Sequence, residues 1–277
     1  MLNVNDIRAA VARHWWTVQR FGLSPAKLRS RLWGRADTRV LCNSIPKAGT
    51  HLLERALCLH PDLYRKFLPT LHSGNMARWK SLDSVLDKLR SGQILVSHLA
   101  YSADFDRALR EREVPCLVLI RDPRDIVVSD TNYISASSGH EFHGLLNSLG
   151  TFQDRLRMMI SGDPSAGLVS VRERLERFAG WLDTSCTIVR YEALVGPQGG
   201  GDTQRQLDTL REIFETLHLP MSAEDLRMLA AQVFSGSSPT FRRGVTGQWR
   251  QHFDPGITKL FNAEAGEMLQ RYGYGDA

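Results

Sequence analysis

The stretch of sequence that decides the fold is RVLCNSIPKAGTHLLERALCLH, residues 39–60. Residues 39–44 form a short apolar run that is typical of a buried strand, and residues 45–50 hold the proline and glycine of a turn. Residues 50–60 then carry apolar side chains at helical spacing and end at a His-Pro pair. A strand, a glycine turn and a helix start in this order predict an anion cradle, because backbone N–H groups and the helix dipole point at the ligand.

The turn itself contains residue types that suit an anion. Gly49 lets the backbone approach the ligand closely, Thr50 adds a hydroxyl and a first-turn N–H, and Lys47 adds a mobile positive charge. A Walker A loop needs its lysine after the last glycine, whereas Lys47 precedes Gly49. The alternative interpretation is an ordinary helix start with a chance lysine.

The rest of the chain continues to alternate strands with helices. Further strands are expected at 93–97, 115–120 and 187–190, and helices at about 102–112, from about 124, within 141–183, and at about 203–217, 222–233 and 256–271. This order predicts a P-loop-like α/β fold, with a central parallel sheet flanked by helices on both faces. We expect one large domain, residues 36–277, after a basic helical segment, residues 1–35.

The basic segment carries an apolar stripe at helical spacing, formed by Ile7, Val11, Trp15 and Val18. Lys27 belongs to the basic residues that surround this stripe. The favoured interpretation is a helix packed on the domain with its basic face in solvent. The alternative is peripheral contact with a membrane surface or an acidic partner.

Composition narrows the class of protein. The 277 residues carry a formal net charge of +5, which suits an anionic ligand but is too weak to predict nucleic-acid binding. Neither a membrane span nor a signal peptide is expected, since charged residues interrupt every apolar run. The cysteines show no metal-ligand spacing and are predicted to be buried, reduced thiols of a cytoplasmic protein: Cys42, Cys58, Cys116 and Cys186.

A second anion site is predicted in RDPRDIVVS, residues 121–129. Arg121 follows a buried strand, at the strand end where open α/β sheets bind ligands, and its guanidinium can hold a phosphate through two hydrogen bonds. Ser129 lies just over two helical turns further on, near the same face as the helix start. Taken alone, the segment favours the simpler interpretation, a surface Arg–Asp pair followed by a serine on a helix.

Together these segments resemble the sulfotransferases. Residues 46–50 resemble the Pro-Lys-Ser-Gly-Thr loop that holds the 5′-phosphosulfate, and residues 121–129 resemble the Arg-(Asn/Asp)-Pro-x-Asp-x-x-x-Ser motif for the 3′-phosphate. Residues 241–249, FRRGVTGQW, resemble the Arg-Lys-Gly-x-x-Gly-x-Trp loop of the same family. The resemblance implies a sulfotransferase domain that uses 3′-phosphoadenosine 5′-phosphosulfate (PAPS) as donor, releases 3′-phosphoadenosine 5′-phosphate (PAP) and needs no metal.

The resemblance also implies the residues of the donor site. Lys47 contacts the leaving oxygen, and Tyr191 either contacts adenine or is a tyrosine at the core edge. Leu52 stands where cytosolic members carry a tryptophan that stacks on adenine, so it can only pack against the ring. The full donor-binding set is Pro46, Lys47, Ala48, Gly49, Thr50, His51, Leu52, Arg121, Ser129, Tyr191, Phe241, Arg242, Arg243 and Gly244.

Sulfuryl transfer also needs a base for the acceptor proton. His98 follows a predicted strand and resembles the base in the Lys-(Thr/Ser)-His-Leu-Pro segment of cytosolic members, although Val96 and Ala100 replace its lysine and proline. Glu54 is a second candidate, because it lies one turn after Thr50; its alternative is a salt-bridged helix residue. The predicted catalytic residues are therefore Lys47, His98 and Glu54.

Other functions and the acceptor stay open at this point. A kinase-like P-loop enzyme is one alternative, and a non-catalytic nucleotide-binding or scaffold protein on the same fold is another. The acceptor is expected to be a small molecule, lipid or glycan, bound by segments 62–80 and 133–167. The aromatic residues proposed to line its site are Tyr64, Phe67, Trp79, Tyr133 and Phe142. The sequence does not indicate an oligomeric state.

Overall fold

The centre of the molecule is a sheet of six parallel strands in the computed structural model, which describes residues 14–33, 37–234 and 244–275. The strand order is β2-β4-β1-β5-β6, and β3 also pairs with β4. The four predicted strands are confirmed as β1 (Val40–Ser44), β4 (Gln93–His98), β5 (Cys116–Ile120) and β6 (Thr187–Arg190). The sequence prediction missed β2 (Tyr64–Arg65) and β3 (Leu71–His72), which have two residues each and therefore no readable alternation.

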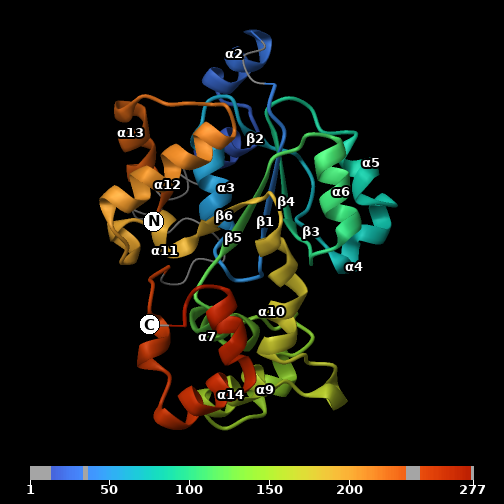
Figure 1. Ribbon diagram of the computed structural model, residues 1–277, viewed down its shortest axis with the longest axis vertical. Helices are drawn as coiled ribbons and strands as arrows, with labels where there is room; N and C mark the ends of the chain where they lie inside the picture. The colour runs from blue at the N-terminus through green and yellow to red at the C-terminus, as the bar shows by residue number, and fades with distance from the viewer. Residues whose placement is uncertain (1–13, 34–36, 235–243, 276–277) are drawn as a thin grey trace, which may run out of the picture.

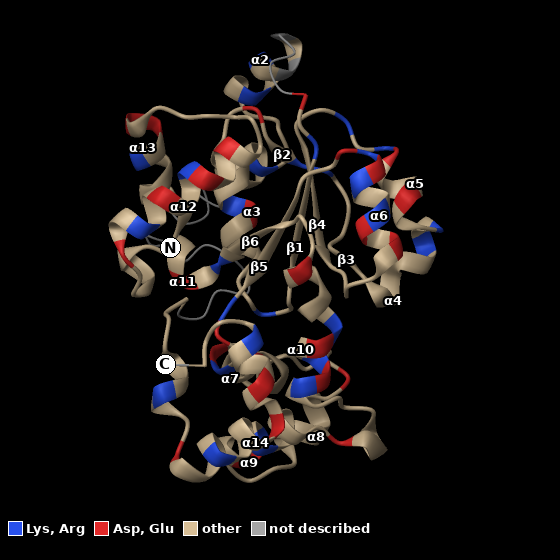
Figure 2. Ribbon diagram, viewed as in Figure 1, with Lys and Arg blue, Asp and Glu red and all other residues tan. Residues whose placement is uncertain are grey.

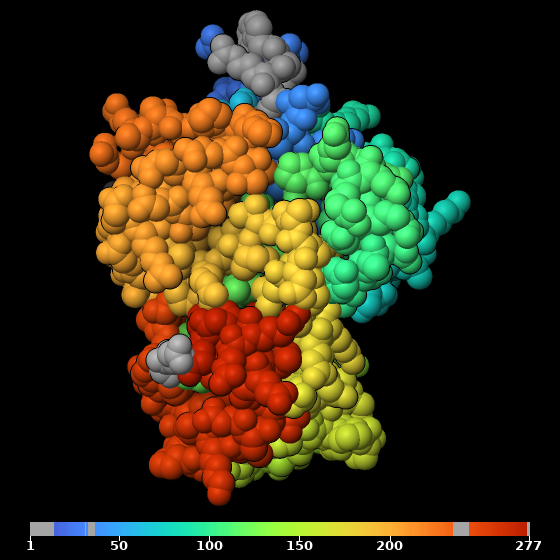
Figure 3. Space-filling view, in the orientation of Figure 1, coloured from blue at the N-terminus to red at the C-terminus, as the bar shows by residue number. Residues whose placement is uncertain are grey.

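Helices cover both faces of the sheet, so the predicted fold class is confirmed (Figure 1). One face carries α3 (Thr50–Leu59), α12 (Thr203–Thr216) and α13 (Ala223–Val233), and the other carries α4 (Ser73–Met76), α5 (Leu82–Leu86) and α6 (Ala103–Glu111). A third group lies beyond the carboxyl ends of the strands: α7 (Pro123–Ala136), α8 (His143–Asn147), α9 (Phe152–Ser161), α10 (Val171–Ala179) and α14 (Pro255–Arg271). Figure 3 shows this group, with the C-terminal segment in red, filling one end of the molecule.

Alternation along the strands divides the core into two apolar clusters. On β1, Leu41 packs into one cluster, while Val40 and Cys42 pack into the other. All three side chains are fully buried, because helices cover both faces. The strands are therefore rigid supports for the loops that leave their carboxyl ends.

The order of the strands creates a crevice between β1 and β5. These strands are neighbours, with Cys42 opposite Leu117. After β1 the chain moves towards β4 on one side of the sheet, whereas after β5 it moves towards β6 on the other. Ligands of open α/β sheets bind where the chain turns in opposite directions in this way. The two predicted anion sites follow these two strands.

The described part of the N-terminal segment, a helix at 14–20 followed by α2 (Pro25–Trp33), packs on the domain. Two details differ from the prediction. Trp15 is 55% exposed and Trp16 packs on the core instead. Lys27, expected on a solvated face, is buried because its Nζ donates to the carbonyl of His60 at 2.7 Å and to that of Leu63; burial lowers its pKa to about 8. Ile7 and Val11 of the predicted stripe lie outside the described residues.

Charged side chains of both signs are interspersed on the surface helices. In Figure 2, basic and acidic residues share α6, α12 and α13. Across residues 14–33, 37–234 and 244–275, no helix is both long enough and apolar enough to cross a membrane.

Candidate functional site

A cavity of about 1110 Å³ gathers most of the residues that the sequence singled out. Twelve of the predicted donor-binding and catalytic residues line it, at the loops after β1 and β5, on the start of α3, or close by. Ala48 does not line the cavity, because it is fully buried in the core beneath the loop. Phe241, Arg242 and Arg243 lie outside the described residues. The lining set is Pro46, Lys47, Gly49, Thr50, His51, Leu52, Arg121, Ser129, Tyr191, Gly244 and His98, together with Glu54.

The loop after β1 has a backbone shape that few residues adopt. Lys47 has a φ of 67° and Gly49 a φ of 105°, both in the left-handed region. A Cβ added to Gly49 would lie 2.4 Å from Cδ2 of Tyr191, so only glycine fits. Gly49 caps α3, whose first-turn N–H groups and positive dipole end face the cavity. The strained Lys47 backbone is of the kind that occurs at ligand-binding loops.

The side chain of Lys47 reaches across the cavity to α7. Its Nζ lies 3.8 Å from the centroid of the Tyr133 ring, a cation–π contact. Burial lowers the pKa of Lys47; Asp130 opposes this shift and Arg121 adds to it. The Lys47 ammonium group therefore lies in the cavity, on the loop that is predicted to hold an anion.

The second anion site is built around Arg121 at the end of β5. Its Nη2 donates to the Val245 carbonyl at 2.9 Å and to Asp125 at 3.3 Å, and its guanidinium lies 4.4 Å from the centroid of the Tyr191 ring. Its Nε is buried and has no hydrogen-bond partner among the residues that the structure describes. A buried guanidinium donor that lacks a partner costs free energy unless an acceptor binds there, so the site fits an oxyanion such as a phosphate.

Asp125 fastens the segment 244–249 to this site. Its carboxylate accepts from the backbone N–H groups of Gly247 at 2.8 Å and Trp249 at 2.9 Å. The Tyr191 hydroxyl donates to the Gly244 carbonyl at 2.7 Å. The sequence showed Asp125 only as a motif residue; its role depends on contacts 122 and 124 residues away along the chain.

Asp122, the other acidic residue of this motif, is also engaged. It caps α7 by accepting from the Arg124 N–H at 2.9 Å, and it pairs with the Arg124 guanidinium at 2.7 Å. The carboxylates of Asp122 and Asp125 are therefore both engaged in contacts within the protein. Neither is available to hold the metal ion that a kinase-like site would use. Within the described ranges, no group of three or more His, Cys, Asp or Glu side chains could hold a metal ion.

His98 ends β4 and faces the same cavity. Its Nδ1 lies 2.9 Å from the Ser44 carbonyl oxygen, which can only accept, so Nδ1 carries the proton and Nε2 is left as the acceptor. Burial lowers the pKa of His98; the Ser44 carbonyl opposes this shift, and His51, His72 and Lys47 add to it. The imidazole is therefore neutral near pH 7, and no residue in the described part of the chain forms a hydrogen bond with its Nε2.

Two residues of β1 hold His98 in place, and sequence reasoning missed both. Asn43 is fully buried and clamps the neighbours of His98: its Oδ1 accepts from Leu99 N at 2.9 Å and Ser97 Oγ at 2.8 Å, and its Nδ2 donates to the Leu99 carbonyl at 3.0 Å. The Ser44 hydroxyl lies 2.6 Å from that of Thr50 and 3.2 Å from His98 Nδ1. A polar residue inside an apolar strand is the only sequence signal.

Glu54 lies at the cavity wall, but its carboxylate is fully engaged. It is 1% exposed and contacts Arg20 twice, once at 3.0 Å, Arg65 at 2.8 Å and His51 Nδ1 at 3.4 Å. Burial alone would raise its pKa, but the His51 hydrogen bond and the charges of Arg65 and Arg20 outweigh burial and lower the pKa to about 2. This carboxylate joins the N-terminal segment to α3.

The far side of the cavity is lined by aromatic and apolar residues of α7, α10 and the segment between α7 and α8. Of the five aromatic residues expected at the acceptor site, Tyr133 and Phe142 line the cavity, whereas Tyr64, Phe67 and Trp79 do not. Phe67 is 86% exposed and packs on Phe21 instead. The sequence did not single out other lining residues, among them Ile134, Leu168, Val169 and Phe178.

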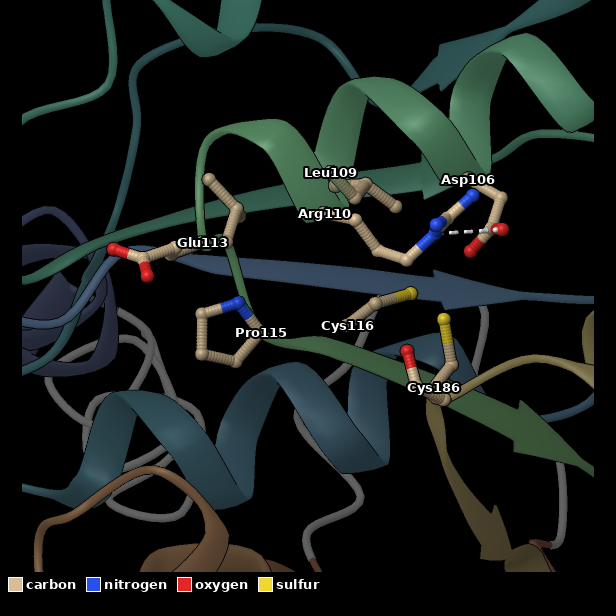
Figure 4. A pocket seen from close by; sticks show the side chains of 9 residues that line it. Asp106, Leu109, Arg110, Glu113, Pro115, Cys116 and Cys186 are labelled. Atoms are coloured by element: carbon tan, nitrogen blue, oxygen red, sulfur yellow. Dashed lines mark hydrogen bonds and ion pairs between the residues drawn. The ribbon is translucent and has the colours of Figure 1, made fainter.

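A second, smaller cavity of about 220 Å³ lies at the opposite end of β5 (Figure 4). The sulfur atoms of Cys116 and Cys186 point towards one another there, at the starts of neighbouring strands. Arg110 pairs with Asp106 at 3.1 Å. All four cysteines are free thiols, and Cys186 is partly exposed.

Comparison with known proteins agrees with this geometry. A family model for the sulfotransferase domain matches residues 37–273. Sulfotransferase 2A6 of Mus musculus is 23% identical, and the match covers 82% of each chain. Mouse sulfotransferase SULT7A1 complexed with PAP has a TM-score of 0.62 at 17% identity, covering 84% of this chain and 85% of that one. Retinol dehydratase in complex with androsterone and PAP has a TM-score of 0.56 at 16% identity, covering 85% and 81%.

The matched region begins just before β1 and ends after α14, so it contains every strand and both anion sites. The chain belongs to the sulfotransferase domain family.

Proposed function

We propose that the protein transfers a sulfuryl group from PAPS to a hydroxyl or amine of a small acceptor, with His98 as the base. One observation carries this proposal. A single cavity holds two separate anion sites, at the Lys47 loop and at Arg121, together with a neutral histidine whose Nε2 is free to accept a proton. PAPS carries a 5′-phosphosulfate and a 3′-phosphate on the same ribose, so one donor molecule can occupy both anion sites.

The residues assigned to the donor fit its charges. The loop at residues 46–50 and the start of α3 would hold the 5′-phosphosulfate through backbone N–H groups and the Thr50 hydroxyl. Arg121, whose Nε has no acceptor among the described residues, and Ser129 would hold the 3′-phosphate. Two of the structural relatives were solved with PAP, which carries the same two phosphates. Phe241, Arg242 and Arg243 stay predicted parts of this site.

The donor supplies a sulfuryl group bonded to a good leaving oxygen. His98 Nε2 takes the proton of the acceptor hydroxyl as the new O–S bond forms, and the Ser44 carbonyl holds the opposite ring nitrogen in the required tautomer. The S–O bond to the phosphate breaks, and Lys47 neutralises the charge that develops on that oxygen. The proton ends on His98 and leaves to solvent, so atoms and charge balance.

Glu54 is better suited to a structural role. Its two arginine partners keep it ionised but occupy its oxygens, whereas a base must be free to approach the acceptor. We therefore assign Glu54 to the anchoring of the N-terminal segment.

The acceptor proposed is an apolar small molecule with one hydroxyl. Tyr133, Phe142 and Phe178 offer flat apolar surface beyond His98. Retinol dehydratase, whose structures hold androsterone or retinol, binds alcohols of this kind. A lipid or a glycan remains the alternative, and so does membrane contact of residues 1–35.

Donor recognition can be tested by calorimetry with PAP and AMP. Wild-type protein should bind PAP at least ~10-fold more tightly, because AMP lacks the 3′-phosphate that Arg121 would hold. Arg121→Ala should remove this preference. Equal affinity of the wild type for both nucleotides would contradict the proposal.

Transfer itself can be tested with labelled donor and a panel of apolar alcohols, with mass spectrometry of the product. Lys47→Ala should lose ~100-fold or more in turnover while PAP affinity changes little. A variant with wild-type turnover would exclude the role given to Lys47. Binding of PAP without turnover of any acceptor would favour a non-catalytic protein on this fold.

A further inference from the structure

The N-terminal helix contributes an indole to the cavity. Trp16 lies at one wall, although it precedes the family-matched region, which starts at residue 37. It is partly buried and, like Leu52 and Phe234, packs against the apolar cluster of the core that contains Leu53. The same wall is completed by Arg55 and Val233. Trp16 thus joins α3 and the end of α13 in forming one side of the cavity.

Two contacts hold this indole in place. The Arg55 guanidinium stacks over the ring at 4.4 Å from its centroid, and Arg55 Nε is itself fixed by the Gln232 carbonyl at 2.7 Å. One helical turn further on, Arg20 of the same N-terminal helix pairs with Glu54, the neighbour of Arg55 on α3. Since both ends of the turn are anchored on α3, the indole is a preorganised surface.

The position of this wall indicates what it would bind. Two apolar regions flank the anion sites: Tyr133, Phe142 and Phe178 on the side of His98, and Trp16, Leu52 and Phe234 on the side of α3 and α13. The acceptor must lie beside His98, where its proton is removed. The heterocyclic base of a doubly phosphorylated nucleoside therefore takes the other region, where a flat aromatic ring is the suitable partner.

We propose that Trp16 is the stacking platform for the purine of the donor nucleotide, and that the N-terminal helix thus supplies this contact from outside the family-matched residues 37–273. The inference rests on the proposed function, because it assumes a nucleotide in this cavity. Leu52 at the same wall is aliphatic, so it can pack against a purine but does not offer an aromatic face for stacking.

The test compares two ligands on purified full-length protein by calorimetry: PAP, and ribose 3,5-bisphosphate, which has both phosphates but no base. Trp16→Leu should weaken PAP binding by about 10-fold or more, as loss of one base-stacking aromatic does. Binding of the base-free ligand should change less than about twofold, because the anion sites are untouched. Trp16→Phe keeps an aromatic ring and should retain most of the affinity for PAP.

Trp15→Leu is the matched control, since Trp15 is adjacent, 55% exposed and absent from the cavity wall. It should bind both ligands like the wild type. If Trp16→Leu weakens both ligands equally, or if Trp15→Leu loses as much PAP affinity, Trp16 only supports the fold and the inference is wrong. Unchanged PAP affinity in Trp16→Leu also overturns it while leaving the proposed function intact. Wild-type protein that binds no PAP overturns the proposed function itself.

Discussion

Replacing Glu54 by glutamine tests whether this residue anchors or catalyses. The pKa of Glu54 is about 2, against an ordinary value of 4.5. One pKa unit corresponds to about 1.4 kcal/mol, so the ionised carboxylate contributes roughly 3 kcal/mol to the free energy of unfolding at neutral pH. Because the pKa is lowered in the folded state, this contribution is complete above about pH 4.5 and is lost as the pH falls towards 2.

Urea unfolding of wild type and Glu54→Gln across this pH range measures the effect. At pH 7 the variant should be about 3 kcal/mol less stable, since it leaves the buried Arg65 without its charged partner, and the difference should narrow below pH 4.5. Glu176→Gln, which breaks a surface pair with Arg172, should cost less than about 0.5 kcal/mol. A stable Glu54→Gln protein that has lost its turnover would refute this reasoning and make Glu54 the base.

Three further predictions concern the site and the thiols. His98→Ala should lose ~100- to 10,000-fold in turnover while still binding PAP in calorimetry, and the acidic limb of the wild-type kcat/KM profile should lie below pH 6.5, because burial lowers the pKa of His98; a limb above pH 6.5 contradicts this. Asn43→Leu should cost about 1–3 kcal/mol in urea unfolding, because it leaves the buried Leu99 N–H and Ser97 hydroxyl without their acceptor while the Leu99 carbonyl keeps the Trp181 indole N–H, and it should also lower the turnover of the folded enzyme; unchanged turnover would contradict a positioning role for Asn43. Cys186 should be the first cysteine alkylated by iodoacetamide in peptide mapping, because a hydrogen bond from Cys116 lowers its pKa whereas the other three thiols are buried; prior labelling of another cysteine counts against it.

The sequence was sufficient for the parts of the fold that carry a strong local pattern. β1, β4, β5 and β6 were predicted because helices cover both faces and every buried strand reads as an apolar run. β2 and β3 were missed since two residues carry no pattern. The apolar stripe in the N-terminal helix predicted that Trp15, instead of Trp16, packs on the domain. Neighbouring residues on a helix point about 100° apart, and only the contact with the rest of the fold decides which of the two is buried.

The residues of the candidate site that belong to recognisable sequence motifs were predicted, and the others were not. The sequence was enough to predict that Lys47 and Arg121 lie close together, because the loops after parallel strands share one edge of the sheet. The roles of Asn43 and Ser44 could not, since they depend on the register that sets Asn43 beside Ser97 on β4. Glu54 could not be assigned either, because its partners Arg20 and Arg65 are distant in sequence.

The attachment of His98, the proposed base, to the sheet has a consequence for engineering. His98 ends β4, and its orienting carbonyl at Ser44 ends the neighbouring strand β1, so the spacing between His98 and the loop at residues 45–50 is set by two paired strands. The apolar wall beyond His98 is built by α7, α10, the residues just before α10 and the residues between α7 and α8, none of which belongs to this pair of strands. Acceptor preference can therefore be redesigned by rebuilding that wall at Phe142, Leu168 or Phe178, while the geometry of transfer is inherited unchanged from the sheet.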